Sequence, residues 1–341
     1  MKFITLITES KDYSKKALAI YKSFGPVYFL PKIISGLPMP QILSSISGYR
    51  KSKILNVFSR VNILVVGLKY QIDKKWIDAM PNLKIIASPA TGYNHLDIEY
   101  ARKRGIKIIS LRGRTSFLKN IPSTAEETMA LIFALARNIP ASFDDVKKGN
   151  WDRLHWRGHQ LLHKTIGLLG FGRLGKLVAK YFKPLGMKVI AYDPYVSKNT
   201  MKKMGVEKVK MDDLFRNSDI VSLHVLLNED VYNLVKAKHF KIMKPSAYLI
   251  NTARGELIEK GALEKALKNK WIAGAALDVM WDERGDGGHL KNNSLVEYAK
   301  KNNNLIIVPH VGGATFEAME TTQEFIADLV QKEIKKIRNY E

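Results

Sequence analysis

The chain of 341 residues contains no cysteine, and its acidic side chains are far fewer than its basic ones. Without cysteine it can form no disulfide bond and has no thiolate nucleophile, and the default expectation is a cytoplasmic protein. No apolar run approaches the roughly 20 residues that a membrane-spanning helix needs. The first residues are typical of a β-strand, with no cleavage site of a signal peptide. These absences exclude thiol chemistry and predict a protein without a membrane segment.

The shortage of acidic residues gives a formal net charge of +23, from 55 lysines and arginines against 32 aspartates and glutamates. Such a charge indicates nucleic-acid binding when the basic residues cluster. Here they are scattered, and the longest unbroken basic run is Arg102–Arg104. Nucleic acid is therefore disfavoured as a partner. A lysine-rich composition, or a field that attracts an anionic substrate and cofactor, explains the charge better.

Three histidines recur every fourth residue, at His155, His159 and His163. On a helix they would share one face and could bind a metal ion. Gly158 interrupts the segment, however, and the segment runs directly into a predicted strand at Thr165. The sequence also lacks a His-Glu-x-x-His motif. We expect surface or linker histidines here and predict no metal site.

The length fits two domains of roughly 150 residues each, and short apolar runs alternate with amphipathic stretches in both halves. This alternation predicts an α/β fold with two doubly wound parallel sheets. In the first half we expect strands at Phe3–Ile7, Ile63–Gly67, Lys84–Ala87 and Lys107–Ser110, with helices near Lys11–Phe24, Lys74–Met80 and Asp97–Arg104. In the second half we expect strands at Thr165–Leu169, Lys188–Tyr192, Ile220–His224, Tyr248–Asn251, Ala273–Leu277 and Leu305–Val308, with a last helix at Phe316–Ile337. The segment Pro31–Val57 gives no clear pattern.

A strongly helical pattern spans Ser123–Ala136, and Ser123 with Glu126 matches a capping box. The helix is apolar on more than one face, so it must be buried on all sides. Because one domain would cover only one face, we predict a symmetric homodimer through this part of the chain.

A glycine-rich turn lies between the predicted strand Thr165–Leu169 and the helix that follows. Its G-x-G-x-x-G spacing is typical of dinucleotide-binding turns, in which the first glycine permits the turn, the second admits the pyrophosphate and the third allows close helix–strand packing. The six residues are Gly170, Phe171, Gly172, Arg173, Leu174 and Gly175. The pyrophosphate would bind the amides of Arg173 and Leu174 at the positive end of the helix. Asp193 ends the next strand, where it would accept the ribose hydroxyls and repel a 2′-phosphate, so we predict NAD rather than NADP. The alternative is a glycine-rich turn of another doubly wound fold.

Arg254 follows the predicted strand Tyr248–Asn251, at the sheet edge where ligands of open α/β sheets bind. A guanidinium there can hold a carboxylate through two hydrogen bonds and polarise an adjacent carbonyl. The alternative is an arginine at a helix start that bonds only to backbone.

His310 follows the last predicted strand, directly after Pro309. A lone histidine is more often structural than catalytic, but a carboxylate at its far nitrogen would stabilise the imidazolium and fix its tautomer. Glu283 is the candidate partner, and Asp282 and Glu317 are competitors that the sequence does not exclude.

Together these residues resemble the D-isomer-specific 2-hydroxyacid dehydrogenases, in particular the 3-phosphoglycerate dehydrogenase-like members without a regulatory domain. The resemblance covers roughly residues 60–335. The segments that carry it are Ala125-Glu126, Gly170–Gly175, Ser218–Val225, Met243–Pro245, Asn251–Glu256, Ala276–Val279 and Pro309–Thr315.

The resemblance implies a Rossmann NAD-binding domain at residues 119–311. It also implies a discontinuous, flavodoxin-like substrate-binding domain at residues 1–118 plus 312–341, with the active site in the cleft between the two. By the same resemblance the catalytic residues are Arg254, Glu283 and His310. Further residues expected at the cofactor are Thr252, Ala253, Asp278 and Gly313, of which Asp278 would meet the nicotinamide carboxamide.

For the substrate, the resemblance implies that the amides of Ala90, Thr91 and Gly92 receive the carboxylate, together with Arg254. Lys69 stands where phosphoglycerate enzymes carry an arginine for the phosphate, and Arg112 and Arg114 lie in a long loop nearby.

The sequence therefore predicts an NAD-dependent oxidoreductase that transfers a hydride between the cofactor and a 2-hydroxy or 2-oxo acid. The net charge and these basic residues favour a phosphoglycerate-like dianionic acid. The alternatives are a glyoxylate- or lactate-type 2-oxo acid reductase and an NAD-sensing, corepressor-like binding protein on the same fold.

Overall fold

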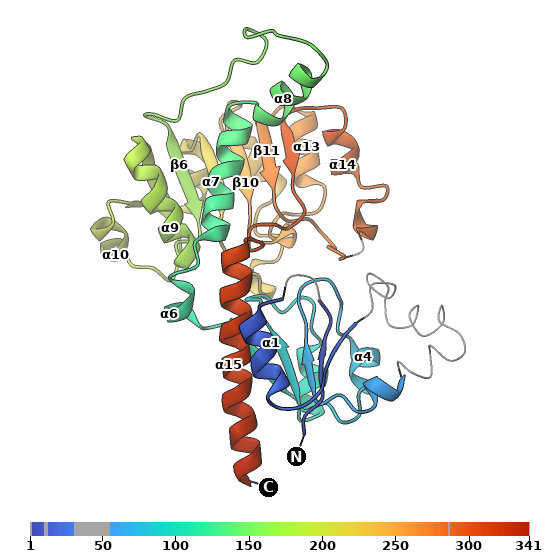
Figure 1. Cartoon of the computed structure of the whole chain (residues 1–341). Coiled ribbons are helices and arrows are strands. Elements are labelled where there is room, and N and C mark those ends of the chain that lie inside the picture. The colour runs from blue at the N-terminus through green and yellow to red at the C-terminus, as the bar shows by residue number, and fades with distance from the viewer. Residues whose placement is uncertain (1, 10–12, 31–54, 286, 341) are drawn as a thin grey trace. The chain divides into compact units, whose positions relative to one another are not determined.

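A computed structural model describes residues 2–9, 13–30, 55–285 and 287–340 (Figure 1). The chain groups into two units. The first comprises Met1–Leu118, Arg284–Gly288 and Phe316–Glu341, and the second comprises Lys119–Glu283 and His289–Thr315. Arg284–Gly288 therefore groups with the first unit, although the sequence led us to expect it in the second. Most of the segment Pro31–Val57, which gave no clear sequence pattern, lies outside the described residues.

The first unit contains a five-stranded parallel sheet with the order β2-β1-β3-β4-β5. Its strands are β1 (Thr5–Ile7), β2 (Val27–Phe29), β3 (Ile63–Val65), β4 (Ile85–Ser88) and β5 (Lys107–Ser110). Its helices are α1 (Lys15–Lys22), α4 (Lys74–Asp78), α5 (Ile98–Lys103), α6 (Thr115–Leu118) and α15 (Phe316–Tyr340). Strands β1, β3, β4 and β5 lie within one to two residues of their predicted bounds, whereas β2 was not predicted.

The two faces of this sheet are covered by different helices, because successive strand residues point to opposite faces. Leu64 and Ile86 pack with Trp76 of α4 in the main apolar cluster of the unit. Helix α15 packs against α1, β4 and β5, and Figure 1 shows α15 running alongside α1. Phe117 and Phe325 stack at 3.7 Å between ring centroids, which fixes α6 against α15. The C-terminal helix is thus part of the first unit.

The second unit contains a seven-stranded parallel sheet with the order β12-β11-β10-β9-β6-β7-β8. Its strands are β6 (Thr165–Leu169), β7 (Lys188–Tyr192), β8 (Glu207–Lys208), β9 (Ile220–Leu223), β10 (Tyr248–Asn251), β11 (Gly274–Leu277) and β12 (Leu305–Ile307). Its α-helices are α7 (Ser123–Ala136), α8 (Ile139–Lys147), α9 (Arg173–Phe182), α10 (Lys198–Lys203), α11 (Met211–Asn217), α12 (Ala237–Lys241), α13 (Ala262–Lys268) and α14 (Ser294–Ala299). Short 3₁₀ turns are η2 (Lys183–Leu185), η3 (Glu229–Val231), η4 (Gly255–Leu257) and η5 (Gly288–Leu290).

Helix α7 has the predicted bounds, but the capping box predicted at its start is wrong. Pro122 is the N-cap residue and no side chain caps the helix, so Ser123 forms no capping box. The apolar residues Leu131, Ile132 and Leu135 are buried in the core of the second unit, where α7 packs against α9, β10, β11 and β12. Ala130 on the same helix is exposed and Phe133 is half-buried, so the burial of α7 does not decide whether the chain dimerises.

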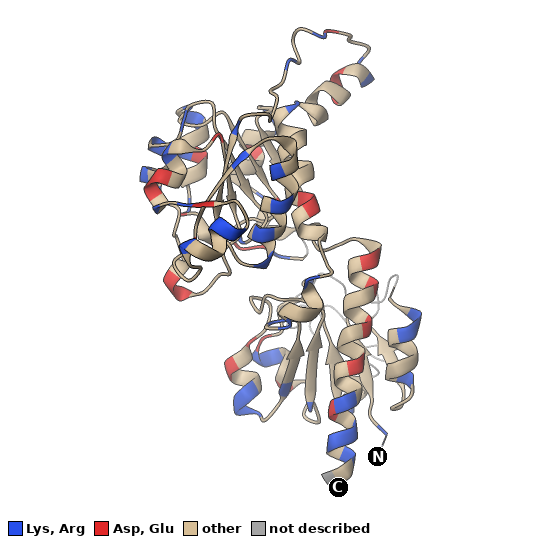
Figure 2. Ribbon diagram, turned by 90° about the vertical axis from the view of Figure 1, so that its left-hand side faces the viewer, with Lys and Arg blue, Asp and Glu red and all other residues tan. Residues whose placement is uncertain are grey.

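Charged residues are spread over the helices of both units in the view of Figure 2. On α15 the acidic residues occupy the first turns and the basic residues the last ones. Within the described part of the chain, no helix combines the length and apolar character of a membrane span. The described residues also hold no cluster of three or more side chains suited to a metal ion.

Candidate active site

Nearly all predicted site residues of the second unit follow the carboxyl end of a strand. Because all seven strands are parallel, these ends meet at one edge of the sheet, where ligands of open α/β sheets bind. The strand that each group follows is β6 for the glycine turn, β7 for Asp193, β10 for Arg254, β11 for Glu283 and β12 for His310. The fold therefore assembles residues that are more than a hundred positions apart in the sequence.

Of the three motif glycines in the turn, two lie too close to other backbone atoms to carry a side chain, and one faces open space. Gly170 has a φ of +95°, and a Cβ there would lie 2.7 Å from the carbonyl oxygen of His224. A Cβ at Gly175 would lie 2.3 Å from the carbonyl oxygen of Gly170. At Gly172 a Cβ would meet nothing within 4 Å. Gly170 and Gly175 thus allow close backbone packing within the unit, and Gly172 leaves free space at the start of α9.

Asp193 also shapes this turn, which the sequence did not reveal. Its Oδ2 accepts a hydrogen bond from the amide of Phe171 at 2.8 Å. Its Oδ1 accepts from the amides of Tyr195 at 2.8 Å and Val196 at 3.2 Å. A carboxylate has about four acceptor positions, so these bonds orient Asp193 and leave capacity for a ribose hydroxyl.

The residues around the turn fit a dinucleotide. The open space over Gly172 is where a pyrophosphate would approach, and the positive end of α9 favours its charge. The amides of Gly172 and Leu174 donate to no acceptor among the described residues. The Arg173 guanidinium donates to the carbonyl oxygen of Ile121 at 2.8 Å, and burial lowers its pKa. This edge therefore offers free backbone donors for phosphate oxygens and a carboxylate for the ribose.

The loop that carries Arg254 is held in place by Asn251, whose side chain accepts from the amide of Ala253 at 3.0 Å and donates to the carbonyl oxygen of Arg254 at 2.8 Å. Gly255 lies against the backbone of Met280, since a Cβ at Gly255 would come within 2.1 Å of it. This contact joins the loop after β10 to the loop after β11.

Arg254 itself is extended, and its guanidinium donates to the carbonyl oxygen of Ala253 at 2.6 Å. Burial lowers the pKa of Arg254, and the negative charges of Glu283, Glu256 and Asp278 partly oppose that effect. A guanidinium remains cationic even so, and burial strengthens its attraction for an anion. Arg254 is therefore a cation suited to binding a carboxylate.

His310 and Glu283 are in direct contact. The Nδ1 atom of His310 lies 2.6 Å from Oε2 of Glu283, and Oε1 of Glu283 accepts from the amide of Met280 at 2.6 Å. Burial would raise the pKa of Glu283, but the bond and charge of His310, the Met280 amide and Arg254 together lower it. Of the competing partners, Asp282 instead pairs with Lys260 at 3.0 Å.

His310 also has an unusual backbone, with a φ of +54°. Residues other than glycine rarely adopt this left-handed backbone conformation. It costs about 1–3 kcal/mol, and such strain is often found at functional sites. Two further contacts hold this part of the chain. Asp278, only 1% exposed, accepts from the amides of Val311 at 2.6 Å and Gly312 at 3.0 Å.

Asp278 is thus a positioning group for the loop of His310, in addition to its expected place at the cofactor. Burial raises the pKa of Asp278 to about 6, against the opposing effects of the Gly312 amide, the charge of His310 and the Val311 amide. Thr252 is also buried, and its hydroxyl is 2.8 Å from that of Thr128 on α7. Gly313 is exposed, with nothing within 4 Å of a Cβ.

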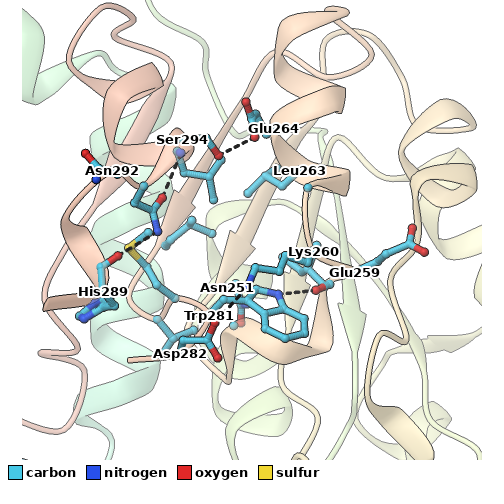
Figure 3. Close-up of a pocket in the computed structure, with 18 of the residues that line it drawn as sticks. Asn251, Glu259, Lys260, Leu263, Glu264, Trp281, Asp282, His289, Asn292 and Ser294 are labelled. Carbon is cyan, nitrogen blue, oxygen red and sulfur yellow. Dashed lines mark hydrogen bonds and ion pairs between the residues drawn. The ribbon is translucent and has the colours of Figure 1, made fainter. Parts of the chain in front are cut away.

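A cavity of about 330 Å³ is lined in part by Asn251 and Gly255 of the loop after β10 and by Met280, Trp281 and Asp282 after β11 (Figure 3). The carbonyl oxygen of Ile258 accepts from the indole of Trp281 at 2.7 Å, and the Lys260–Asp282 ion pair stands at its rim. Arg254, Glu283 and His310 do not line the cavity, although the neighbouring Asn251 and Gly255 do.

In the first unit, the predicted substrate residues follow β3 and β4. Among the described residues, the amides of Thr91 and Gly92 donate to no protein acceptor, so they are available to a carboxylate. Hydrogen bonds of Tyr93 with Ser110 at 2.8 Å and of His95 with Ser88 at 3.2 Å anchor the loop that follows.

Lys69 and Arg112, two of the basic residues predicted near the substrate, have neighbours other than an anion. The backbone amide of Lys69 lies 3.4 Å from Oε1 of Glu9, a residue that the sequence gave no reason to select. The Arg112 guanidinium lies over the ring of Tyr93, 4.9 Å from its centroid.

Comparisons with known proteins agree with this arrangement. Residues 129–312 match the NAD binding domain of the D-isomer specific 2-hydroxyacid dehydrogenases. The chain is 38% identical over 281 residues to a glyoxylate reductase of Thermococcus litoralis, which covers 80% of this chain and 81% of that protein. It is 34% identical over 290 residues to a D-3-phosphoglycerate dehydrogenase of Methanocaldococcus jannaschii, covering 85% of this chain but only 53% of that longer protein. The crystal structure of a D-lactate dehydrogenase from Aquifex aeolicus, complexed with NAD and lactic acid, is similar with a TM-score of 0.79 and 26% identity, covering 98% of this chain and 96% of that one.

The chain therefore belongs to the D-isomer specific 2-hydroxyacid dehydrogenase family. The predicted fold of two parallel-sheet α/β domains, NAD as the cofactor and the 2-hydroxyacid dehydrogenase class are confirmed. The roles of the individual site residues stay predictions.

Proposed function

We propose that the chain reduces a small 2-oxo acid with NADH, and that Arg254, Glu283 and His310 carry the chemistry. The observation that supports this proposal most directly is the 2.6 Å contact between His310 and Glu283, at the sheet edge that also holds the half-buried Arg254. Bound NADH supplies the hydride that reduces the carbonyl carbon of the acid.

Side chains of the protein would bind the substrate, polarise its carbonyl and supply the proton. Arg254 holds the substrate carboxylate and polarises the carbonyl oxygen. His310 uses Nδ1 for Glu283, so Nε2 is the nitrogen that gives a proton to the substrate oxygen. The negative charge of Glu283 stabilises the imidazolium until that transfer.

For the substrate, we propose a 2-oxo acid whose only anionic group is its carboxylate. The carboxylate of Glu9 lies beside the backbone amide of Lys69 and would repel a second anion there. The guanidinium of Arg112 lies over the ring of Tyr93. The match to the glyoxylate reductase covers 81% of that protein at 38% identity, against 53% at 34% identity for the phosphoglycerate dehydrogenase, which favours the same choice. A phosphoglycerate-like dianion is the second candidate, favoured by the net charge of +23 and by the exposed side chain of Lys69.

The test is NADH oxidation by the purified protein against glyoxylate, hydroxypyruvate, pyruvate and phosphohydroxypyruvate. We expect turnover with at least one unphosphorylated acid and a loss of several orders of magnitude in kcat/KM for Arg254→Ala. A protein that binds NADH tightly but reduces none of these acids would instead be an NAD-sensing binding protein.

We further propose a homodimer formed by the second unit, supported by an apolar surface on α8 and the loop after it. Ile139, Phe143 and Val146 are spaced as one helix face and are 51%, 63% and 48% exposed. Trp151 and Leu154 follow, at 87% and 61% exposed. Figures 1 and 2 show α8 and this loop standing away from the sheet of the unit. An exposed apolar surface of this kind is typical of an interface, and two copies would bury it symmetrically.

A cytoplasmic location is proposed on the sequence alone, and fractionation of cells would test it.

A further inference from the structure

The first unit has a topological switch point between β1 and β3. The strand order β2-β1-β3-β4-β5 places β2 on one side of β1 and all later strands on the other. In sheets of this kind, ligands bind outside the carboxyl ends of the two strands at which the order reverses. The residues at these ends are Thr8 and Glu9 after β1, and Gly67 to Lys69 after β3.

Glu9 is packed onto the segment that follows β3. Its carboxylate occupies the space beside Gly67, where an added Cβ would lie 2.1–2.3 Å from the carboxylate atoms. Its Oε1 is 3.4 Å from the amide of Lys69, a long contact that leaves acceptor capacity on both oxygens. Gly67 therefore leaves room for a carboxylate at the switch point.

The charges and hydrogen bonds around Glu9 are unusual for a structural position. Burial raises the pKa of Glu9, and the amide and positive charge of Lys69 partly oppose that effect. The adjacent Thr8 is only 4% exposed, and its hydroxyl has no hydrogen-bond partner among the described residues. Buried hydroxyls are normally bonded, so the Thr8 hydroxyl has capacity for a hydrogen bond to a group bound at this edge.

We propose that Glu9 determines substrate specificity, by accepting a hydrogen bond from a hydroxyl on the carbon next to the carbonyl of the 2-oxo acid and by excluding acids with a second anionic group there. This inference rests on the proposed reduction of a 2-oxo acid. The substrate class is a 3-hydroxy-2-oxo acid, for which hydroxypyruvate is the smallest probe.

A neutral donor suits this position better than a charged group. A phosphate would stand against the Glu9 carboxylate, and an ammonium would stand against the neighbouring Lys69. A hydroxyl satisfies the carboxylate without adding charge, and the free amides of Thr91 and Gly92, at the end of β4 on the same edge, remain available to the substrate carboxylate.

The test compares kcat/KM with NADH for three acids in the wild type and in Glu9→Gln, which keeps the shape and an acceptor oxygen. Phosphohydroxypyruvate carries the second anion, hydroxypyruvate the hydroxyl, and glyoxylate no third carbon. Without the carboxylate charge, phosphohydroxypyruvate should improve by about 10-fold or more relative to glyoxylate, while hydroxypyruvate should change by less than about 3-fold. Glyoxylate itself should stay within about 2-fold of the wild-type value, because Glu9 would not touch it.

A charge-matched control separates a local from a general effect. Glu333→Gln removes one negative charge from α15 of the same unit, where Glu333 pairs with Lys336, and should leave all three ratios unchanged. The inference is overturned if Glu9→Gln leaves the preference between the phosphorylated and unphosphorylated acids as it was, or if it lowers all three rates equally. If the wild type reduces no 2-oxo acid at all, the proposed function itself is wrong. This outcome differs from the two above, which overturn only the role of Glu9.

Discussion

Two glycines of the dinucleotide turn should respond to the same substitution in different ways. At Gly175 an added methyl group would lie 2.3 Å from the carbonyl oxygen of Gly170, so the turn or α9 must shift by roughly an ångström. Overpacking of this kind costs about 1–3 kcal/mol, which lowers the Tm by roughly 2–12 °C at about 2–4 °C per kcal/mol for a domain of this size. At Gly172 the methyl group would meet no protein atom within 4 Å.

Gly172→Ala should therefore cost no more than about 1 kcal/mol, mainly because alanine is a poorer N-cap residue than glycine. The same methyl group would occupy the space expected for the pyrophosphate, so NADH affinity should fall by at least about 10-fold. Gly175→Ala should lose stability without ligand and lose affinity only as far as the turn is displaced.

Thermal unfolding without cofactor and NADH titration by calorimetry measure the two effects separately. Each variant is the control for the other, because both add one methyl group to the same turn. The assignment of this turn as the phosphate site would be refuted if Gly172→Ala bound NADH as tightly as the wild type. The packing argument would be refuted if Gly175→Ala unfolded at the wild-type temperature.

Three further predictions concern the chemistry, the cofactor and the assembly. Glu283→Gln removes the negative charge beside His310, so the pH at which the rate of 2-oxo acid reduction falls to half should drop by about one unit. The control variant Glu256→Gln should move this pH by no more than a few tenths of a unit. An unchanged midpoint in Glu283→Gln would contradict His310 as the proton donor. Asp193→Ala should reduce the preference for NADH over NADPH by about 10-fold, and a wild type that used both equally would show that Asp193 does not select the cofactor. Phe143→Glu should convert the proposed dimer into monomers of 38.6 kDa in light scattering, with NADH binding retained, and a monomeric wild type would exclude the dimer.

The sequence predicted the elements whose signal is local. The strands Thr165–Leu169 and Lys107–Ser110 were placed at their observed bounds, because each is a short apolar run beside a turn or helix signal. The strand β2 was missed, since it lies at the sheet edge and its residues Val27–Phe29 are partly exposed. The capping box predicted at Ser123 is wrong for a different reason: the motif fits, but the helix begins one residue earlier than the motif implies, so Pro122 is the N-cap residue.

The contacts that position the site could not be predicted from sequence spacing. Asp278 binds amides more than thirty residues away, and Asp193 bonds back to the turn that precedes its own strand. Glu9 escaped notice because nothing in its neighbourhood distinguishes it from an ordinary surface glutamate. Its place beside Lys69 arises only when β1 and β3 pair.

The path of the chain limits which chimeras of two family members can keep each unit intact. The chain passes from one unit to the other after Leu118, Glu283, Gly288 and Thr315, so the first unit is assembled from three separate pieces of sequence. Its smallest piece begins directly after Glu283, and Gly285 fits closely against the backbone of Lys69, where a Cβ would lie 2.3 Å from the carbonyl oxygen. A chimera that grafts a new specificity segment around Lys69 must therefore also carry the Arg284–Gly288 piece of the same donor. Two-block recombination at residue 118 alone would separate these fitted parts and strain the residue next to Glu283.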